Sequence, residues 1–248
     1  MKENQEFADN VFKNFNDLFF NPEIERRRQL NLIQEPFYLI AGQVVFFCDG
    51  KQPIIRLNEE VKATVKIKKN VDITNENFWA SRNEVEKVLF SDPENLDCGH
   101  ATMIHFKDGY KLTFDFIYNK HTCNKYLSTA EEFLKSAQFA LENNFISAFI
   151  DNSFSSMELL AKSKLLLETN KNINGKTNHK AIKAEFNKRY KNDLNNIEIN
   201  YKIVLNKLSL LRNDARYLEK PFTISEEDKK LIIDSMLDLH KKIKENIS

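Results

Sequence analysis

The segment Leu208-Ser209-Leu210-Leu211-Arg212-Asn213-Asp214-Ala215-Arg216-Tyr217 decides how the C-terminal half of this 248-residue chain is interpreted. Before it, apolar residues recur at helical spacing, at Tyr201, Val204, Leu205 and Leu208. This periodicity predicts a helix from about residue 197, with one apolar stripe facing a core. Arg212 comes one residue after Leu211, so it sits on or beside that stripe, where a guanidinium needs a partner.

Four more helices are predicted around this one. Ser128 with Glu131 three residues later is a capping-box pattern, and an apolar stripe follows it. A second helix is expected at about 145–168, a third at 180–191, and a last one beginning at Ser225. Short loops between such helices make neighbours antiparallel, so the C-terminal half is predicted to be an antiparallel five-helix bundle.

The first 120 residues show mostly β-strand patterns. An opening helix is expected to end at Asn21-Pro22, because the residue before a proline is pushed out of the helical region. The stretch 37–47 is rich in β-branched and aromatic residues and is expected to pair with 54–57, and 61–67 alternates as a strand does. A short helix is predicted at 81–89.

The clearest hairpin pattern lies between Thr102 and Phe116. A three-residue loop, Lys107-Asp108-Gly109, would pair Phe106 with Tyr110 and Ile104 with Leu112, which keeps apolar residues on one face. Because a one-residue slip moves every side chain to the other face, the pattern favours this loop.

The fold class is therefore predicted to be α+β. The period of the apolar pattern changes from two to about three-and-a-half after Asn119, and the boundary is expected within 119–127. This divides the chain into a β-rich domain with flanking helices at 1–122 and a helical bundle at 123–248.

The composition is that of a globular protein, with 42% hydrophobic and 29% charged residues. The formal net charge of +1 provides no global attraction to nucleic acid, so any such contact needs a local patch. No apolar run reaches the length of a membrane span, and the first residues lack the apolar core of a secretory signal. Three cysteines form no disulfide framework, which favours a cytoplasmic location.

The helical half resembles the HEPN superfamily over nearly its whole length. The resemblance is carried by the break at Asn143-Asn144-Phe145, by Thr177-Asn178-His179-Lys180 at the third helix, and above all by Leu208 to Tyr217. In the ribonuclease members an Arg, often followed by a polar residue, precedes a His after four to six residues. Two copies of that motif meet at a dimer interface and cut RNA without metal.

Only half of that motif is present. Arg212 and Asn213 fit, but Tyr217, Leu218 and Glu219 stand where the His would fall. A second, non-catalytic branch has Arg, two residues, and then Ala-Asp-Tyr. Arg212, Ala215 and Tyr217 match it, with Arg216 in place of its Asp, so the resemblance favours this branch. The N-terminal domain resembles no family that we recognise.

Several side chains are candidates for the site. Arg212 either forms an internal ion pair with Glu158 or Asp151, or faces a groove at a dimer seam and holds phosphate, which its planar fork suits. Arg216 would extend a phosphate-binding pair or remain a solvated cation near a helix C-terminus. Asn213 and Tyr217 are further catalytic candidates, although a tyrosine that closes the seam is the ordinary explanation.

The third helix supplies two more binding candidates, His179 and Lys183. Basic residues crowd this helix, at Lys180, Lys183, Lys188, Arg189 and Lys191. They would follow a phosphate backbone or form an ordinary solvated face.

Cys98-Gly99-His100 and His121-Thr122-Cys123 contain the thiol and imidazole ligands of structural zinc sites. The predicted strand register places these pairs on different faces, and their spacing matches no common zinc finger. We therefore predict no metal site and no cofactor.

Two functions from different classes follow from the resemblance. The first is a dimerising binding and assembly module, associated with RNA or a nucleotide in bacterial stress or defence, with a nucleotidyltransferase-type protein as a candidate partner. The alternative is a metal-independent endoribonuclease of toxin type with a degenerate, Arg-centred site. A third reading makes Arg212 purely structural.

Overall fold

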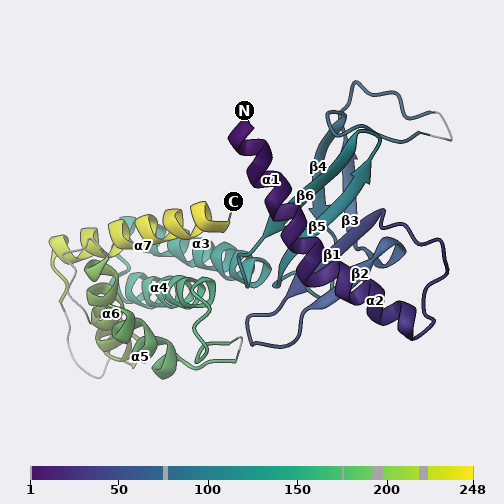
Figure 1. Cartoon of the computed structure of the whole chain (residues 1–248). Helices are drawn as coiled ribbons and strands as arrows, with labels where there is room; N and C mark the ends of the chain where they lie inside the picture. Colours follow the sequence, from purple (N-terminus) through teal and green to yellow (C-terminus); the bar gives the residue numbers. More distant parts are fainter. Residues whose placement is uncertain (1, 75–77, 175, 191–197, 218–222, 248) are drawn as a thin grey trace. The chain divides into compact units, whose positions relative to one another are not determined.

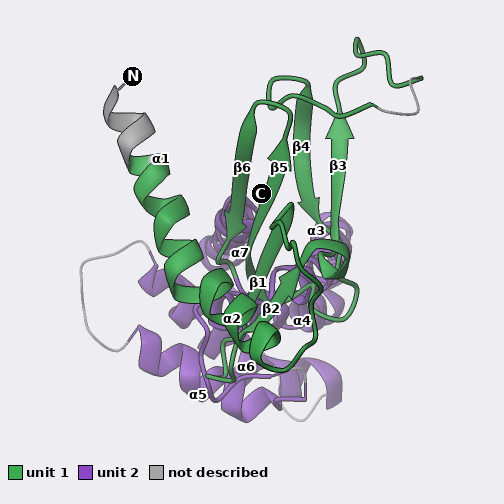
Figure 2. Cartoon of the chain, turned by 45° about the vertical axis from the view of Figure 1, so that its right-hand side comes forward, with its two compact units in different colours: residues 1–117 green, residues 118–248 purple. Residues whose placement is uncertain are grey.

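The computed structural model describes residues 2–74, 78–174, 176–190, 198–217 and 223–247. The chain divides into two units, 1–117 and 118–248 (Figure 2). The first contains the β-strands and the second is helical, so the predicted α+β class is confirmed. Among the described helices, none is both long and apolar enough to span a membrane.

The N-terminal unit begins with one unbroken helical rod, and the predicted stop at Asn21-Pro22 is wrong. Helix α1 (Lys2–Phe15) continues through a π-helical turn, η1 (Asn16–Phe20), into α2 (Asn21–Gln29). Asn21 keeps helical backbone angles. Pro22 lies in the first turn of α2, where a missing N–H is tolerated, and the wider π-turn precedes it.

Four antiparallel strands form the main sheet of this unit, in the order β2-β1-β5-β6 (Figure 1). They are β1 (Ala41–Phe46), β2 (Ile54–Leu57), β5 (Gly99–Phe106) and β6 (Gly109–Asp115). After β2 comes a 3₁₀ turn, η2 (Asn58–Glu60), and β3 (Ala63–Ile67) and β4 (Val85–Phe90) form a separate pair. The predicted pairing of 37–47 with 54–57 and the strand within 61–67 are confirmed.

The short helix predicted at 81–89 is wrong, because this stretch contains β4. The register between β3 and β4 shifts at Lys66/Ile67: Lys66 pairs with Lys87, and Ile67 pairs with Val85. This bulge places one extra residue, Glu86, on β4. Val85 and Val88 therefore both point into a core, and their spacing imitates a helix.

The register predicted for the β5–β6 hairpin is also wrong. A two-residue loop, Lys107-Asp108, places Phe106 opposite Gly109 and Ile104 opposite Lys111. Gly109 has φ +124°, which a side chain rarely adopts. The apolar pattern predicted the wrong register because both faces of β5 are covered. Neither face is exposed to solvent, so the pattern does not identify a polar side. Met103 packs in one cluster and Phe106 in another.

The helical rod packs on one face of the sheet through Phe20, which is fully buried. A Cβ built at Gly42 would lie 2.7 Å from the Phe20 ring, so only glycine permits this approach. The other side of the sheet carries a polar row across β2, β1 and β5, at Arg56, Gln43 and Thr102. All three side chains are buried.

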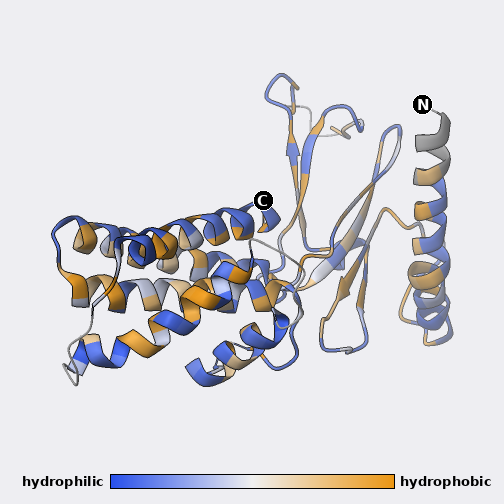
Figure 3. Cartoon of the chain, turned by 90° about the vertical axis from the view of Figure 1, so that its left-hand side faces the viewer, coloured by the Kyte–Doolittle hydropathy of each residue, from blue (hydrophilic) through white to orange (hydrophobic). Residues whose placement is uncertain are grey.

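The second unit confirms the predicted bundle of five helices over the described residues. They are α3 (Lys120–Glu142), α4 (Ile146–Leu167), α5 (His179–Arg189), α6 (Ile199–Tyr217) and α7 (Glu226–Ile247). Their inward residues form one core that includes Met157, Leu208 and Met236. Figure 3 shows alternating hydrophilic and hydrophobic turns along α7, which ends at the label C.

The two predicted caps have different outcomes. Ser225 caps α7, since the Asp228 N–H donates to its Oγ at 3.1 Å. Ser128 does not begin a helix, because α3 already starts at Lys120. Asn119, in the left-handed conformation, precedes it and donates from Nδ2 to the Leu166 carbonyl at 2.9 Å. A tertiary contact therefore fixes this helix start.

Candidate anion-binding site

Three helices bring the candidate residues together through their periodicity. On α4, Asp151, Phe154 and Glu158 are spaced by three and four residues, so they share one face. On α6, a second face carries Leu205, Ser209, Arg212 and Arg216. The first turns of α5 add His179, Lys180, Ile182 and Lys183.

Arg212 pairs with Asp151, one of the two partners that the sequence named. Its Nε donates to the Asp151 Oδ1 at 3.0 Å, and its guanidinium carbon lies 4.4 Å from the centre of the Phe154 ring. The ring offers the cation a favourable π face and holds the guanidinium plane. Glu158, the other named partner, pairs instead with His179.

Arg216 converges on the same carboxylate oxygen, with its Nε 2.9 Å from the Asp151 Oδ1. Both arginines therefore point their Nε toward one acid. Over the described part of the chain, no hydrogen bond engages the Nη nitrogens of either arginine. The side chains are 21% exposed at Arg212, 44% at Arg216 and 29% at Asp151. This cluster carries net positive charge and is open to solvent.

Asn213 and Tyr217 do not join this cluster. Both are exposed, and the Tyr217 side chain remains 66% exposed. The helical period turns them roughly 100° away from Arg212 and Arg216 respectively. Of the catalytic candidates, only Arg212 therefore faces Asp151.

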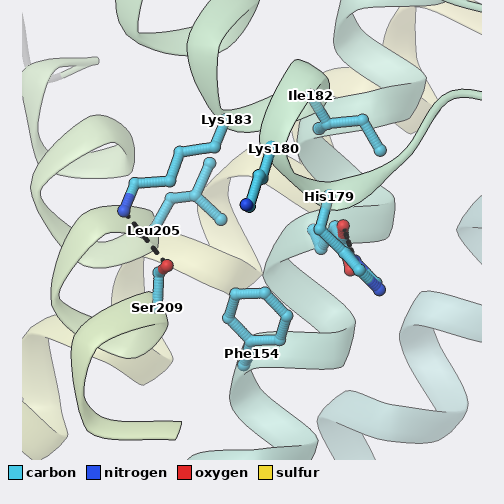
Figure 4. Close-up of a pocket in the computed structure, with 8 residues that line it drawn as sticks. Phe154, His179, Lys180, Ile182, Lys183, Leu205 and Ser209 are labelled. Atoms are coloured by element: carbon cyan, nitrogen blue, oxygen red, sulfur yellow. Dashed lines mark hydrogen bonds and ion pairs between the residues drawn. The ribbon is translucent and has the colours of Figure 1, made fainter. Parts of the chain in front are cut away.

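His179 and Lys183 line a cavity of about 240 Å³ beside the arginine pair. The Nδ1 of His179 contacts Glu158, and the Lys183 amine donates to the Ser209 Oγ at 3.0 Å. Figure 4 shows Lys180 and Lys183 reaching toward this space from α5, with the Phe154 ring on the α4 side. Phe154 lines the cavity and also contacts Arg212, so the two features adjoin.

The remaining basic residues of α5 lie elsewhere. Arg189 donates to Glu168 at 2.8 Å, and Lys188 is exposed and does not line the cavity. Lys191 lies outside the described residues. The sequence predicted one basic group on this helix, but of its cations only Lys180 and Lys183 line the cavity with His179.

Sequence reasoning missed two contributors, Phe154 and Ser209. The available signal was their position: Phe154 lies between Asp151 and Glu158 on one face of α4, and Ser209 lies one turn before Arg212. Neither residue is unusual by type, so only the helix pairing identifies them.

The cysteines and histidines weighed for zinc have other surroundings. Cys123 is buried in α3 with its Sγ 3.5 Å from the Ser163 carbonyl, and His100 stacks on Phe90 at 4.3 Å between ring centres. The described ranges contain no group of three or more His, Cys, Asp or Glu that could hold a metal ion. The strand register predicted for this region was wrong by one residue.

Comparison with known proteins identifies the helical unit alone. A family model described as HEPN domain matches residues 123–246, which is half of the chain and spans α3 to α7. No curated protein and no solved structure matches the chain significantly. The resemblance of the helical half is thereby confirmed, and the chain belongs to the HEPN domain family.

Proposed function

We propose that this protein is a dimerising HEPN binding and assembly module that holds RNA or a nucleotide through phosphate, without an intact nuclease motif. The observation that carries the proposal is the convergence of Arg212 and Arg216 on Asp151. One carboxylate orients two guanidiniums and neutralises only one of them. The Nη groups remain to bind an anion in the two-pronged way that suits phosphate.

Burial and charge favour an anion over a purely structural pair. Arg212 is held on Phe154 and Asp151, so less side-chain freedom is lost when an anion binds. Lys180, Lys183 and His179 lie next to it in the cavity. A local basic patch of this kind supplies the phosphate contact that the chain's net charge of +1 cannot supply.

The outer face of α6 supports a homodimer. Ile199, Ile203, Leu210 and Tyr217 are all exposed, with exposed fractions from 36% to 72%. Their spacing of four and seven residues forms a seam like that of a coiled coil. Two copies packed on this face would bury these side chains, and the arginine stripe lies roughly 135° around the helix from the seam. A phosphate groove would then flank each side of the dimer.

The absent histidine argues against nuclease chemistry at this position. Near neutral pH, His is the side chain that both gives and takes a proton unaided, and Tyr217 replaces it here. The match of Arg212, Ala215 and Tyr217 to the non-catalytic branch supports the same view. By that resemblance, the role is in bacterial stress or defence, and a nucleotidyltransferase-type protein is a candidate partner.

The test is RNA binding by fluorescence anisotropy, with wild type compared with Arg212→Met. We expect about a tenfold loss of affinity, because one charge-assisted phosphate contact is removed while the alkyl packing stays. Arg189→Met is the matched control, since Arg189 belongs to the same unit and pairs with Glu168. Equal losses in both variants would contradict a localised site. Leu210→Glu tests the seam, and sedimentation should show a monomer.

A metal-independent endoribonuclease is the second candidate, favoured by the same two arginines. Their Nη groups could stabilise the extra charge that develops at phosphorus while a ribose 2′-hydroxyl attacks. Incubation of a mixed RNA pool with chelator separates the two functions. Cleavage by wild type that disappears in Arg212→Ala would establish the nuclease, and intact RNA at high protein concentration would favour binding.

A further inference from the structure

We infer that the cavity between α4, α5 and α6 binds a phosphomonoester, the terminal phosphate of an RNA strand or of a free nucleotide. This inference rests on the proposed function, because it names which phosphate lies beside the arginine pair. It is carried by the charges that line the cavity and by the cavity volume, whereas the proposed function is carried by the convergence of Arg212 and Arg216 on Asp151.

The charges of the cavity suit a phosphate that carries about two negative charges. Lys180 and Lys183 contribute two ammonium groups, and Glu158 contributes one carboxylate. Glu158 is occupied by the Nδ1 of His179, which fixes the imidazole and leaves Nε2 for a ligand. These three charged side chains leave one net positive charge in the cavity, and His179 adds a polar contact. A phosphomonoester carries about −1.5 to −2 near pH 7, whereas an internal phosphodiester carries one charge.

The partners of the lysines leave donors available to the ligand. Lys183 donates to the neutral Ser209 Oγ at 3.0 Å, so this contact positions the ammonium without cancelling its charge. The ammonium has further N–H groups to offer. In Figure 4 the amine of Lys180 is drawn among His179, Lys183 and Phe154. Phosphate oxygens placed there would meet the ammonium groups of two lysines from one helix.

The volume limits how much of the ligand enters. At about 240 Å³, the cavity is smaller than the roughly 300–1,000 Å³ typical of sites that enclose a drug-sized ligand. It holds a phosphate and the adjoining sugar, not the two nucleosides that flank an internal phosphate. Its apolar lining, Phe154, Ile182 and Leu205, suits the carbon side of a ribose. The next phosphate of a strand would then lie toward Arg212, which contacts the same Phe154 ring.

The test uses the full-length protein and one short RNA in three forms: 5′-phosphorylated, 3′-phosphorylated and with hydroxyl groups at both ends. We expect one phosphorylated form to bind about tenfold more tightly than the hydroxyl form. Inorganic phosphate, added as a competitor, should remove this difference in affinity. Titration with 5′-AMP separates a free nucleotide from a strand end as the source of the phosphate.

Lys180→Met with Lys183→Met should abolish the preference for the phosphorylated end, so that the phosphorylated and hydroxyl forms bind this double variant with equal affinity. Lys188→Met is the control, because Lys188 is exposed on the same helix and does not line the cavity. A preference that is lost equally in the control would overturn the inference. The comparison of the three RNA forms uses only the wild-type protein. It therefore tests the inference even if the double variant misfolds.

The outcomes also separate this inference from the proposed function. Equal affinity for all three RNA forms, with binding still dependent on Arg212, would overturn the phosphomonoester cavity and leave the RNA-binding module standing. Binding of 5′-AMP and phosphate without any RNA binding would support the cavity and overturn RNA association. No binding of any of these ligands would overturn both.

Discussion

Asp92 and Asp151 each hold two basic side chains, yet their surroundings differ. In the N-terminal unit, Asp92 pairs with Arg56 at 2.6 Å and with Lys62 at 3.0 Å. In the bundle, Asp151 pairs with Arg212 at 3.0 Å and Arg216 at 2.9 Å. The side chain of Asp92 is 0% exposed, whereas that of Asp151 is 29% exposed.

The second difference is how completely each carboxylate is bonded. Asp92 also accepts from the Asn95 Nδ2 at 2.6 Å and from the Glu94 N–H at 3.2 Å, and Arg56 donates its other Nη to Gln43. Both oxygens of Asp92 and both Nη groups of Arg56 are therefore hydrogen-bonded within this closed cluster. Asp151 binds two Nε groups and leaves the Nη ends open. The same charge arrangement therefore stabilises a fold in one unit and presents donors in the other.

Asp92→Asn should cause the largest loss of unfolding free energy. It leaves the buried Arg56 without its counter-charge, which costs about 3–5 kcal/mol of unfolding free energy. Urea unfolding followed by tryptophan fluorescence measures this directly, because the single Trp of the chain, Trp79, lies in the N-terminal unit. A loss below about 1 kcal/mol would mean that the closed cluster is no more structural than a surface pair.

Lowering the pH should destabilise the N-terminal unit through the same Asp92 cluster. Burial raises the pKa of Asp92, but hydrogen bonds from Asn95, Arg56 and Lys62 outweigh burial and hold that pKa well below its usual range. The stabilisation is therefore complete above the unfolded-state pKa of about 3.9 and is lost as pH falls toward the folded-state value. One such group changes the unfolding free energy by at most about 1.4 kcal/mol per pH unit.

The measurement is an NMR titration of the Asp92 carboxyl carbon together with urea unfolding between about pH 5 and pH 2. Other carboxylates add to the acid slope: a hydrogen bond from Arg26 helps to lower the pKa of Glu23 to about 2. Glu23→Gln therefore serves as a control that removes this contribution and leaves that of Asp92. If Asp92 titrated near pH 4, the hydrogen bonds around it would not favour the charged form.

The comparison also shows which features the sequence can predict. The helices of the bundle follow from long amphipathic periods, which need no knowledge of the partner. The register of β5 and the strand β4 do not follow, since β5 is covered on both faces and the bulge at Glu86 makes Val85 and Val88 look helical. In each case, packing decided what the local pattern left ambiguous.

The candidate site, like the fold, could be predicted from the sequence only in part. The position of Arg212 beside its apolar stripe implied a partner, and Asp151 was one of two named. Asp151 and Glu158 are seven residues apart on one face of α4, so choosing between them needs the offset of α6 along α4. The cavity could not be predicted, because it arises where side chains of three helices fail to fill the space.

The smallest effect on stability, and the sharpest test of the comparison, is expected for Asp151→Asn. The pair is partly exposed and screened by solvent, so its loss should change the unfolding free energy by less than about 1 kcal/mol. Removal of the carboxylate that both arginines share should raise RNA affinity about threefold to tenfold and steepen its dependence on salt. Glu168→Gln is the matched control, since Glu168 pairs with Lys164 and Arg189 outside the site. If Asp151→Asn instead destabilised the bundle as strongly as Asp92→Asn destabilises its unit, with RNA affinity unchanged, Arg212 would be a structural ion pair. Both carboxylate clusters would then be structural, and the cavity beside α5 and the dimer seam on α6 would remain as candidate surfaces of the bundle.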